Sequence, residues 1–221
     1  MATRPGSRRS ARRRGRKVRA LPIHGNLIAD ALTRLCGDLS RLRVPFALVG
    51  GLAVSAIAEP RLTRDVDVAV AVDSEAQAER LLHTLSGRGY TVVGSVEQTA
   101  TGRLATARLL ARTAPGIVVD LLFASSGVEQ EVARLARPLE LLPGLTVPVA
   151  RVGHLLALKV LARDDRRRPQ DLDDLRALMR EARQSDLRLA RKTLDLIRAR
   201  GFNRRRDLVG AWNRLLRAKT T

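Results

Sequence analysis

The sequence predicts an α/β domain with a mixed sheet, followed by an all-helical C-terminal domain. Up to residue 150, stretches with helical periodicity alternate with short β-branched runs, whereas from Val152 onward apolar residues recur almost only at helical spacing. Residues 1–20 hold nine basic side chains and no acidic one, and such a block repels itself and stays solvated. We therefore expect a disordered basic arm at 1–20, the α/β domain at 21–150 and the helical domain at 151–221.

Local signals predict the elements in chain order. Leucines at helical spacing indicate a first amphipathic helix, and Gly50-Gly51 ends the strand that follows it. Ser74 is a capping residue before acidic residues, and Pro169 and Gly201 separate helices in the second half. In the first half we expect helices at 26–43, 52–59, 74–85 and 127–135, strands at 44–49, 66–72, 90–94, 103–111 and 116–123, and a two-part strand across Pro143-Gly144. In the second half we expect helices at 152–162, 170–183, 186–199 and 204–218.

The chain of 221 residues is strongly basic, with 41 Lys+Arg against 22 Asp+Glu and a net charge of +19. This excess favours attraction to nucleic-acid phosphates. The alternative is an arginine-biased composition, because only four of the basic residues are lysines. Aromatic residues make up 2% of the chain, which argues against single-strand binding on stacked aromatic platforms.

The single cysteine, Cys36, excludes a disulfide framework and a cysteine-based zinc site, and it indicates a reducing, cytoplasmic environment. No apolar run reaches the roughly 20 residues of a membrane helix, so we expect no membrane partner. No apolar segment follows Arg8-Arg9, as a twin-arginine signal would require, although the composition of the arm is compatible with a transit peptide.

Two carboxylates lie on one face of a predicted strand. Side chains alternate along a strand, so Asp65 and Asp67 share one face while Val66 and Val68 take the other. The two carboxylates are then roughly 6–7 Å apart along the strand and repel each other unless a cation lies between them. Oxygen ligands on one rigid strand suit Mg²⁺. The alternative is the exposed face of an edge strand.

A third carboxylate, Asp120, interrupts a strand that is apolar on both faces and is therefore predicted to be central. A lone carboxylate there costs several kcal/mol unless it is paired or bound to metal. Together with Asp65 and Asp67 it would form a site that could hold two cations roughly 3.5–4 Å apart. The alternative is a salt bridge to an arginine such as Arg64.

The pair Gly50-Gly51 follows a strand and opens a helix. Glycine permits close approach of the backbone, and a helix N-terminus offers free N–H groups to an anion. A phosphate held there would lie near a metal ion at Asp65 and Asp67, because the next helix and strand fit between these positions.

The combined pattern resembles the nucleotidyltransferase fold of the polymerase-beta superfamily. Its signature of strand, glycine pair, helix, Asp-x-Asp and a later Asp is matched by Val49-Gly50-Gly51, Asp65-Val66-Asp67 and Asp120. The stretches 155–163 and 168–175 look like the later motifs of AbiEii-type toxins, which include the mycobacterial MenT toxins. The resemblance covers about residues 40–180.

The resemblance implies a role for each matching residue. Asp65 and Asp67 resemble the metal-binding pair, and Asp120 resembles the carboxylate that can deprotonate the attacking hydroxyl. Lys159 resembles a lysine that contacts the phosphates of the nucleotide, and either Asp171 or Asp174 resembles the final aspartate of the motifs. Gly50, Gly51, Thr63 and Arg64 are assigned to nucleotide binding, and Thr63 matches a position that antitoxin kinases phosphorylate in some relatives. Gly51 departs from the Ser of many superfamily members.

The residues of the second half agree with this interpretation. Lys159 lies on an otherwise apolar helix and needs a polar partner, which a triphosphate would provide; the alternative is that the side chain extends to solvent. Asp171 and Asp174 are three residues apart and so share one helical face. Arg163 and the arginines at 166–168 form a basic cluster suited to triphosphate or RNA, or a solvated loop. We expect His154 and Cys36 to be structural.

The sequence therefore predicts an Mg²⁺-dependent nucleotidyltransferase toxin. It would transfer a nucleoside monophosphate from an NTP to RNA, with the resemblance implying the 3′ end of tRNA, and it would thereby block translation under the control of a cognate antitoxin. The alternatives are modification of a protein (AMPylation) or of an aminoglycoside, and a non-catalytic RNA-binding module. A pocket for a cationic antibiotic should be acidic, so the net charge of +19 disfavours the aminoglycoside.

Overall fold

The computed structural model describes residues 25–58, 60–61, 63, 65–98, 102–164 and 169–220. The predicted arm at 1–20, Arg64 and the arginines at 166–168 lie outside these residues, so what was expected of them stays a prediction.

A seven-stranded sheet forms the centre of the first half, in the order β3-β4-β5-β2-β1-β7-β6. The pairs β2–β5 and β1–β7 are parallel and the other pairs are antiparallel, which confirms the predicted mixed sheet. The strands are β1 (Phe46–Leu48), β2 (Asp65–Val70), β3 (Tyr90–Glu97), β4 (Leu104–Ala111), β5 (Val118–Leu122), β6 (Arg137–Leu142) and β7 (Leu145–Val149).

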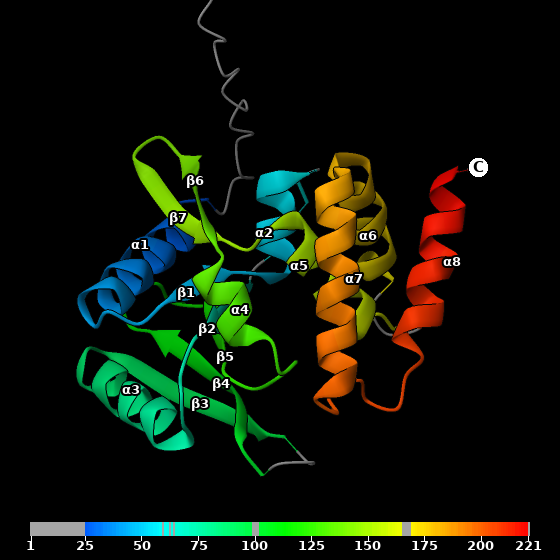
Figure 1. Cartoon of the computed structure of the whole chain (residues 1–221). Coiled ribbons are helices and arrows are strands. Elements are labelled where there is room, and N and C mark those ends of the chain that lie inside the picture. The colour runs from blue at the N-terminus through cyan, green and yellow to red at the C-terminus, as the bar shows by residue number, and fades with distance from the viewer. Residues whose placement is uncertain are drawn as a thin grey trace, which may run out of the picture.

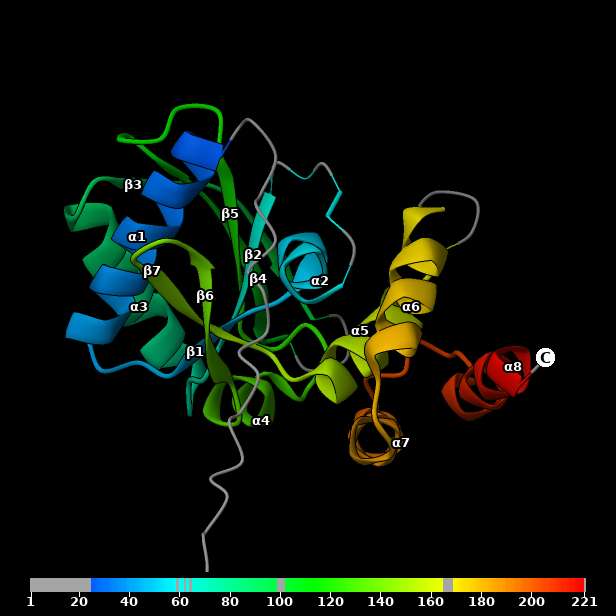
Figure 2. The same ribbon diagram turned by 90° about the horizontal axis from the view of Figure 1, so that it is seen from above.

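The helices also follow the predicted order, and the second half is all-helical as expected. Figures 1 and 2 show α1 and α3 on one side of the sheet, and α2 together with α5 to α8 on the other. The helices are α1 (Gly25–Arg41), α2 (Gly50–Ile57), α3 (Glu75–Gly87), α4 (Glu129–Arg134), α5 (Val152–Ala162), α6 (Gln170–Glu181), α7 (Gln184–Ala199) and α8 (Leu208–Thr220).

The alternation of side chains along β2 places apolar residues on one face of the sheet and carboxylates on the other. Val66, Val68 and Val70 are fully buried on one face, whereas Asp65 and Asp67 lie on the other face and are exposed and half-buried. The periodicity read from the sequence therefore separates core from site along a single strand.

Most predicted helices differ from the structure by one or two residues at an end, and the largest difference is at the start of the last helix. The last helix begins at Leu208 instead of 204, because Arg204 and Arg205 adopt left-handed φ values of 52° and 56°. The Asp207 side chain accepts a hydrogen bond from the Gly210 N–H at 2.8 Å and satisfies the first turn. The helix expected from 186 begins at Gln184, where the Arg183 N–H donates to the Asp186 carboxylate. The Ser74 cap is confirmed, with its side chain accepting from the Gln77 N–H.

Cys36 packs against the core and His154 is buried. Burial raises the pKa of the Cys36 thiol to about 12, and burial lowers the pKa of His154 to about 4, so both are neutral near pH 7. Within the described part of the chain, no helix combines the length and apolarity needed to cross a bilayer.

The crossing of α5 and α7 depends on Gly153. A Cβ built at position 153 would lie 2.5 Å from the Asp186 carbonyl oxygen and 2.7 Å from Leu189 Cβ. We expect Gly153→Ala to lower the free energy of unfolding by about 1–3 kcal/mol, because the two helix backbones must move apart. Urea unfolding followed by circular dichroism measures this.

The matched control is Gly87→Ala at the end of α3, where an added Cβ meets nothing within 4 Å. We expect this change to be neutral or to stabilise by up to about 1 kcal/mol. Equal destabilisation by both substitutions would contradict the close approach of α5 and α7.

Candidate active site

The register of three neighbouring strands brings the predicted carboxylates together. Asp67 on β2 is the direct partner of Asp120 on β5, and Asp120 is the direct partner of Arg108 on β4. Asp65 shares the sheet face of Asp67. Asp65, Asp67, Asp120 and Arg108 line one cavity of about 740 Å³ between this face and the helical half. The prediction that Asp120 lies on a central strand beside the strand of the Asp pair is confirmed.

Arg108 neutralises Asp120. Its Nε and Nη2 donate to the two carboxylate oxygens at 2.9 and 2.7 Å, a bidentate pair. The hydrogen bond to Asp120 and the charge of that carboxylate raise the pKa of Arg108, and the charges of Asp65 and Asp67 contribute in the same direction. The sequence offered Arg64 as an example of an arginine partner; the partner in the structure is Arg108, which the register of β4 places directly opposite Asp120.

The donor set of this cavity fits a divalent cation. Six carboxylates and four cationic side chains line the cavity, which leaves an excess of oxygen donors of the kind that Mg²⁺ prefers. Among the described residues, no three acidic, His or Cys side chains converge as they stand to enclose a metal ion. The carboxylates are thus assembled on one face, but Asp120 is shared with Arg108.

The glycine pair lies against charged side chains, and Gly50 also has a left-handed backbone that favours glycine. Gly50 has a φ of 64°, and a Cβ there would overlap Asp67 Oδ2; a Cβ at Gly51 would overlap the Arg61 guanidinium. Gly50 also begins α2, so the free N–H groups of this helix face the carboxylate cavity. In this structure the Arg61 guanidinium occupies the space that a side chain at position 51 would take.

A buried ionic network lies on the opposite wall. Lys159 Nζ is 2.7 Å from Asp171 Oδ1 and 2.7 Å from Asp174 Oδ2, and Arg61 Nε is 2.7 Å from Asp174 Oδ1. The Lys159 side chain is 12% exposed, so the alternative in which it extends to solvent is wrong. Asp171 lines the cavity, and its buried Oδ2 has no hydrogen-bond partner among the described residues. Asp174 joins the lysine to Arg61.

The cavity also contains one predicted residue, Thr63, and two arginines that the sequence analysis missed, Arg61 and Arg204. Thr63 lines the cavity, as expected for a nucleotide contact. Arg204 reaches it from the helical half and donates to the Ser125 carbonyl oxygen at 3.1 Å. Arg61 and Arg204 were missed because each lies in an irregular segment, where spacing predicts no face.

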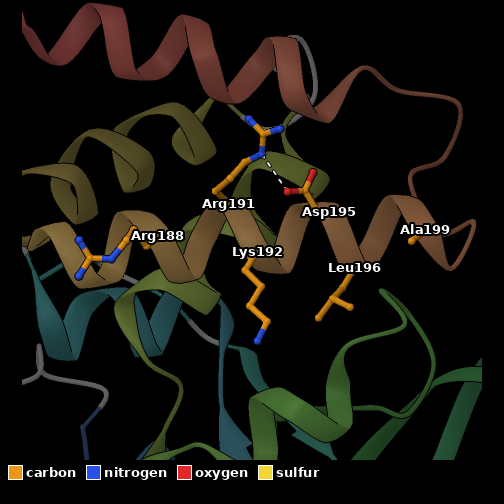
Figure 3. A pocket seen from close by; sticks show the side chains of 6 residues that line it. All are labelled: Arg188, Arg191, Lys192, Asp195, Leu196 and Ala199. Carbon is orange, nitrogen blue, oxygen red and sulfur yellow. Dashed lines mark hydrogen bonds and ion pairs between the residues drawn. The ribbon is translucent and has the colours of Figure 1, made fainter.

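A second, shallow hollow lies on the surface of α7. It is lined by Arg188, Arg191, Lys192, Asp195, Leu196 and Ala199, all from this helix. Figure 3 shows Arg191 turned toward Asp195, with which it is paired at 3.0 Å, while Lys192 and Leu196 lie on another side of the helix. Three of its six lining side chains are basic and one is acidic.

Comparisons with known proteins identify the family of the chain and similar folds. A protein-family model described as "Nucleotidyl transferase AbiEii toxin, Type IV TA system" matches residues 33–219. A nucleotidyltransferase-like protein from Paracoccidioides brasiliensis is structurally similar, with 20% identity, a TM-score of 0.50, and coverage of 85% of this chain and 93% of that one. The antibiotic-resistance factor ANT(2″)-Ia has 13% identity, a TM-score of 0.51, and coverage of 78% and 92%. No curated protein sequence matches the chain.

Removal of the buried Lys159 charge should destabilise the protein, because Lys159 holds Asp171 and Asp174 together. We expect Lys159→Met to lower the free energy of unfolding by about 3–5 kcal/mol, because Asp171 and Asp174 would be left buried without their shared cation. The control is Arg176→Met on α6, which removes the partner of the exposed Asp173. It should lower the free energy of unfolding by less than about 1 kcal/mol. Thermal unfolding at neutral pH compares the two, and similar losses would contradict the network.

Proposed function

Because this chain belongs to the AbiEii family of nucleotidyl transferase toxins, we propose that it transfers a nucleoside monophosphate from an NTP to an RNA acceptor with the help of Mg²⁺. Family membership makes the chain a nucleotidyltransferase of a toxin–antitoxin system, with a nucleotide substrate and an antitoxin partner. The resemblance drawn from the glycine pair and the carboxylates is thereby confirmed. The metal, the acceptor and the consequence for the cell form the proposal.

We assign the metal to Asp65, Asp67 and Asp120. A divalent cation bound there supplies two kinds of chemistry, since it lowers the pKa of a hydroxyl and offsets the charge of a triphosphate. Asp67 is held against the Gly50 turn, which fixes the distance between carboxylate and phosphate site. Asp120 accepts the proton of the attacking hydroxyl once its oxygens are released from Arg108.

We assign the triphosphate to the turn at Gly50-Gly51. The helix N-terminus offers backbone N–H groups, and Arg61 lies directly over Gly51. Lys159, on the facing wall, lines the same cavity. The buried Oδ2 of Asp171 has no hydrogen-bond partner within the described part of the chain and is available to a donor group of the nucleotide. The reaction is then in-line attack of the acceptor hydroxyl on the α-phosphorus, with pyrophosphate as the leaving group.

The distribution of charge favours RNA as the acceptor. Residues 151–221 contain 20 basic and 9 acidic residues, whereas residues 21–150 contain 12 basic and 13 acidic residues. The basic excess therefore falls on the helical half and on the N-terminal arm. The arginines and the lysine on the surface of α7 belong to this basic half (Figure 3). A polyanion that follows the helical half would reach the cavity past Arg204.

We further propose that the acceptor is the 3′ end of tRNA. A nucleotide added there would block aminoacylation and stop translation, and the antitoxin would restrain this activity. Transfer to a protein side chain and a non-catalytic RNA-binding role are the competing functions. The observation that carries the proposal is the row of Asp67 and Asp120 in register beside the Gly50 turn.

Incubation of the protein with Mg²⁺, each α-labelled NTP and total RNA tests the reaction. We expect label in a tRNA-sized band with the wild-type chain and a loss of at least about 100-fold with Asp67→Asn, because one metal ligand is removed. RNA affinity, measured by fluorescence anisotropy, should change by less than about twofold, since Asp67 makes no contribution to the basic surface.

Asp73→Asn is the matched control, because Asp73 follows the same strand but is exposed and pairs with Arg134. It should keep full labelling. Label in protein instead of RNA would support AMPylation, and binding of RNA without any labelling would support the non-catalytic role.

A further inference from the structure

Arg108 holds the carboxylate that the proposed reaction needs. Both oxygens of Asp120 accept from its guanidinium, and the side chain of Asp120 is only 12% exposed. A divalent cation at the same carboxylate would lie next to this guanidinium, and the two positive charges would repel each other. The bidentate pair and a bound cation at Asp120 are therefore competing arrangements of the same side chain.

The position of Arg108 indicates what could release it. In the strand order β4-β5-β2-β1, Arg108 lies on one side of Asp120, and Gly50, which follows β1, lies on the other. A triphosphate at the Gly50 turn approaches the carboxylates from the β1 side. An anion that draws Arg108 away must come from the β4 side, where the acceptor has to lie for in-line attack.

The surface beside Arg108 suits one nucleotide unit. Leu122, Thr106 and Val96 are direct partners across β5, β4 and β3, and they form a ledge two residues along the strands from Asp120 and Arg108. Val96 is 61% exposed, so the ledge is open on its β3 side. A second guanidinium, that of Arg204, lies on the same cavity at Ser125. Two guanidiniums beside an exposed, largely apolar ledge fit phosphates and a sugar or base together.

We propose that Arg108 is an acceptor-binding residue that holds Asp120 in the absence of RNA and moves to a phosphate of the RNA 3′ end when the acceptor binds. Asp120 is then released for the divalent cation and the attacking hydroxyl. This inference rests on the proposed function. Binding of the acceptor thereby completes the metal site. With an acceptor that has no phosphate, Arg108 stays on Asp120 and the metal site stays incomplete.

Mn²⁺ binding without nucleotide or RNA tests the competition directly. We expect Arg108→Gln to lower the half-saturating Mn²⁺ concentration by about tenfold, the effect of removing one nearby like charge. Arg108→Lys should have a smaller effect, because it keeps the charge without the two-pronged geometry. The control is Arg112→Gln, an exposed arginine just after the same strand, which should leave the concentration unchanged. Electron paramagnetic resonance of free Mn²⁺ gives the readout, and circular dichroism confirms folding.

RNA binding tests the second half of the inference. A hairpin RNA with a single-stranded 3′ end should bind Arg108→Gln about five- to tenfold more weakly than the wild-type chain, and the same hairpin without that end should bind both equally. Unchanged Mn²⁺ affinity in Arg108→Gln, or an equal loss for both RNAs, would overturn the inference even if labelling of RNA succeeds. If labelling fails while both binding results hold, Arg108 keeps this role and the proposed reaction is the part that is wrong.

Discussion

The pairing of Asp67 with Asp120 on adjacent parallel strands is the constraint from which the site follows. Two carboxylates at one level of a sheet repel each other, and a largely buried one needs a positive partner. The structure meets this need with Arg108 from the next strand, which is the direct partner of Asp120. A cation that binds Asp120 must therefore compete with this arginine for the carboxylate.

The same principle organises the facing wall. Lys159 is shared by Asp171 and Asp174, and Asp174 in turn holds Arg61 from the segment between α2 and β2. The glycine pair brings Arg61 and Asp67 against the backbone at the start of α2. The ion pair of Arg61 with Asp174 thus joins the α/β half to the helical half at the cavity, and each half contributes charged groups to it. The cavity belongs to both parts of the chain.

The sequence predicted the fold well because its elements have strong local signals. Alternation in β2 separated the valines from the two aspartates, and the i,i+3 spacing placed Asp171 and Asp174 on one face. The sequence analysis missed the arginines that lie beside these carboxylates. Arg108 was not recognised because the pairing of β4 with β5 is a long-range contact that no local pattern contains. Arg61 and Arg204 lie in irregular segments, where no spacing pattern predicts a position. The left-handed backbone at Arg204 and Arg205 also explains why the last helix begins later than predicted.

The central claim is that Asp65, Asp67 and Asp120 hold a divalent cation beside the Gly50 turn. The most direct test is a crystal structure of the full chain with Mn²⁺ and a non-hydrolysable NTP analogue, read by anomalous scattering. The account predicts an anomalous peak within bonding distance of Asp67, with the triphosphate at the start of α2. A peak elsewhere, or a triphosphate away from that turn, would contradict it.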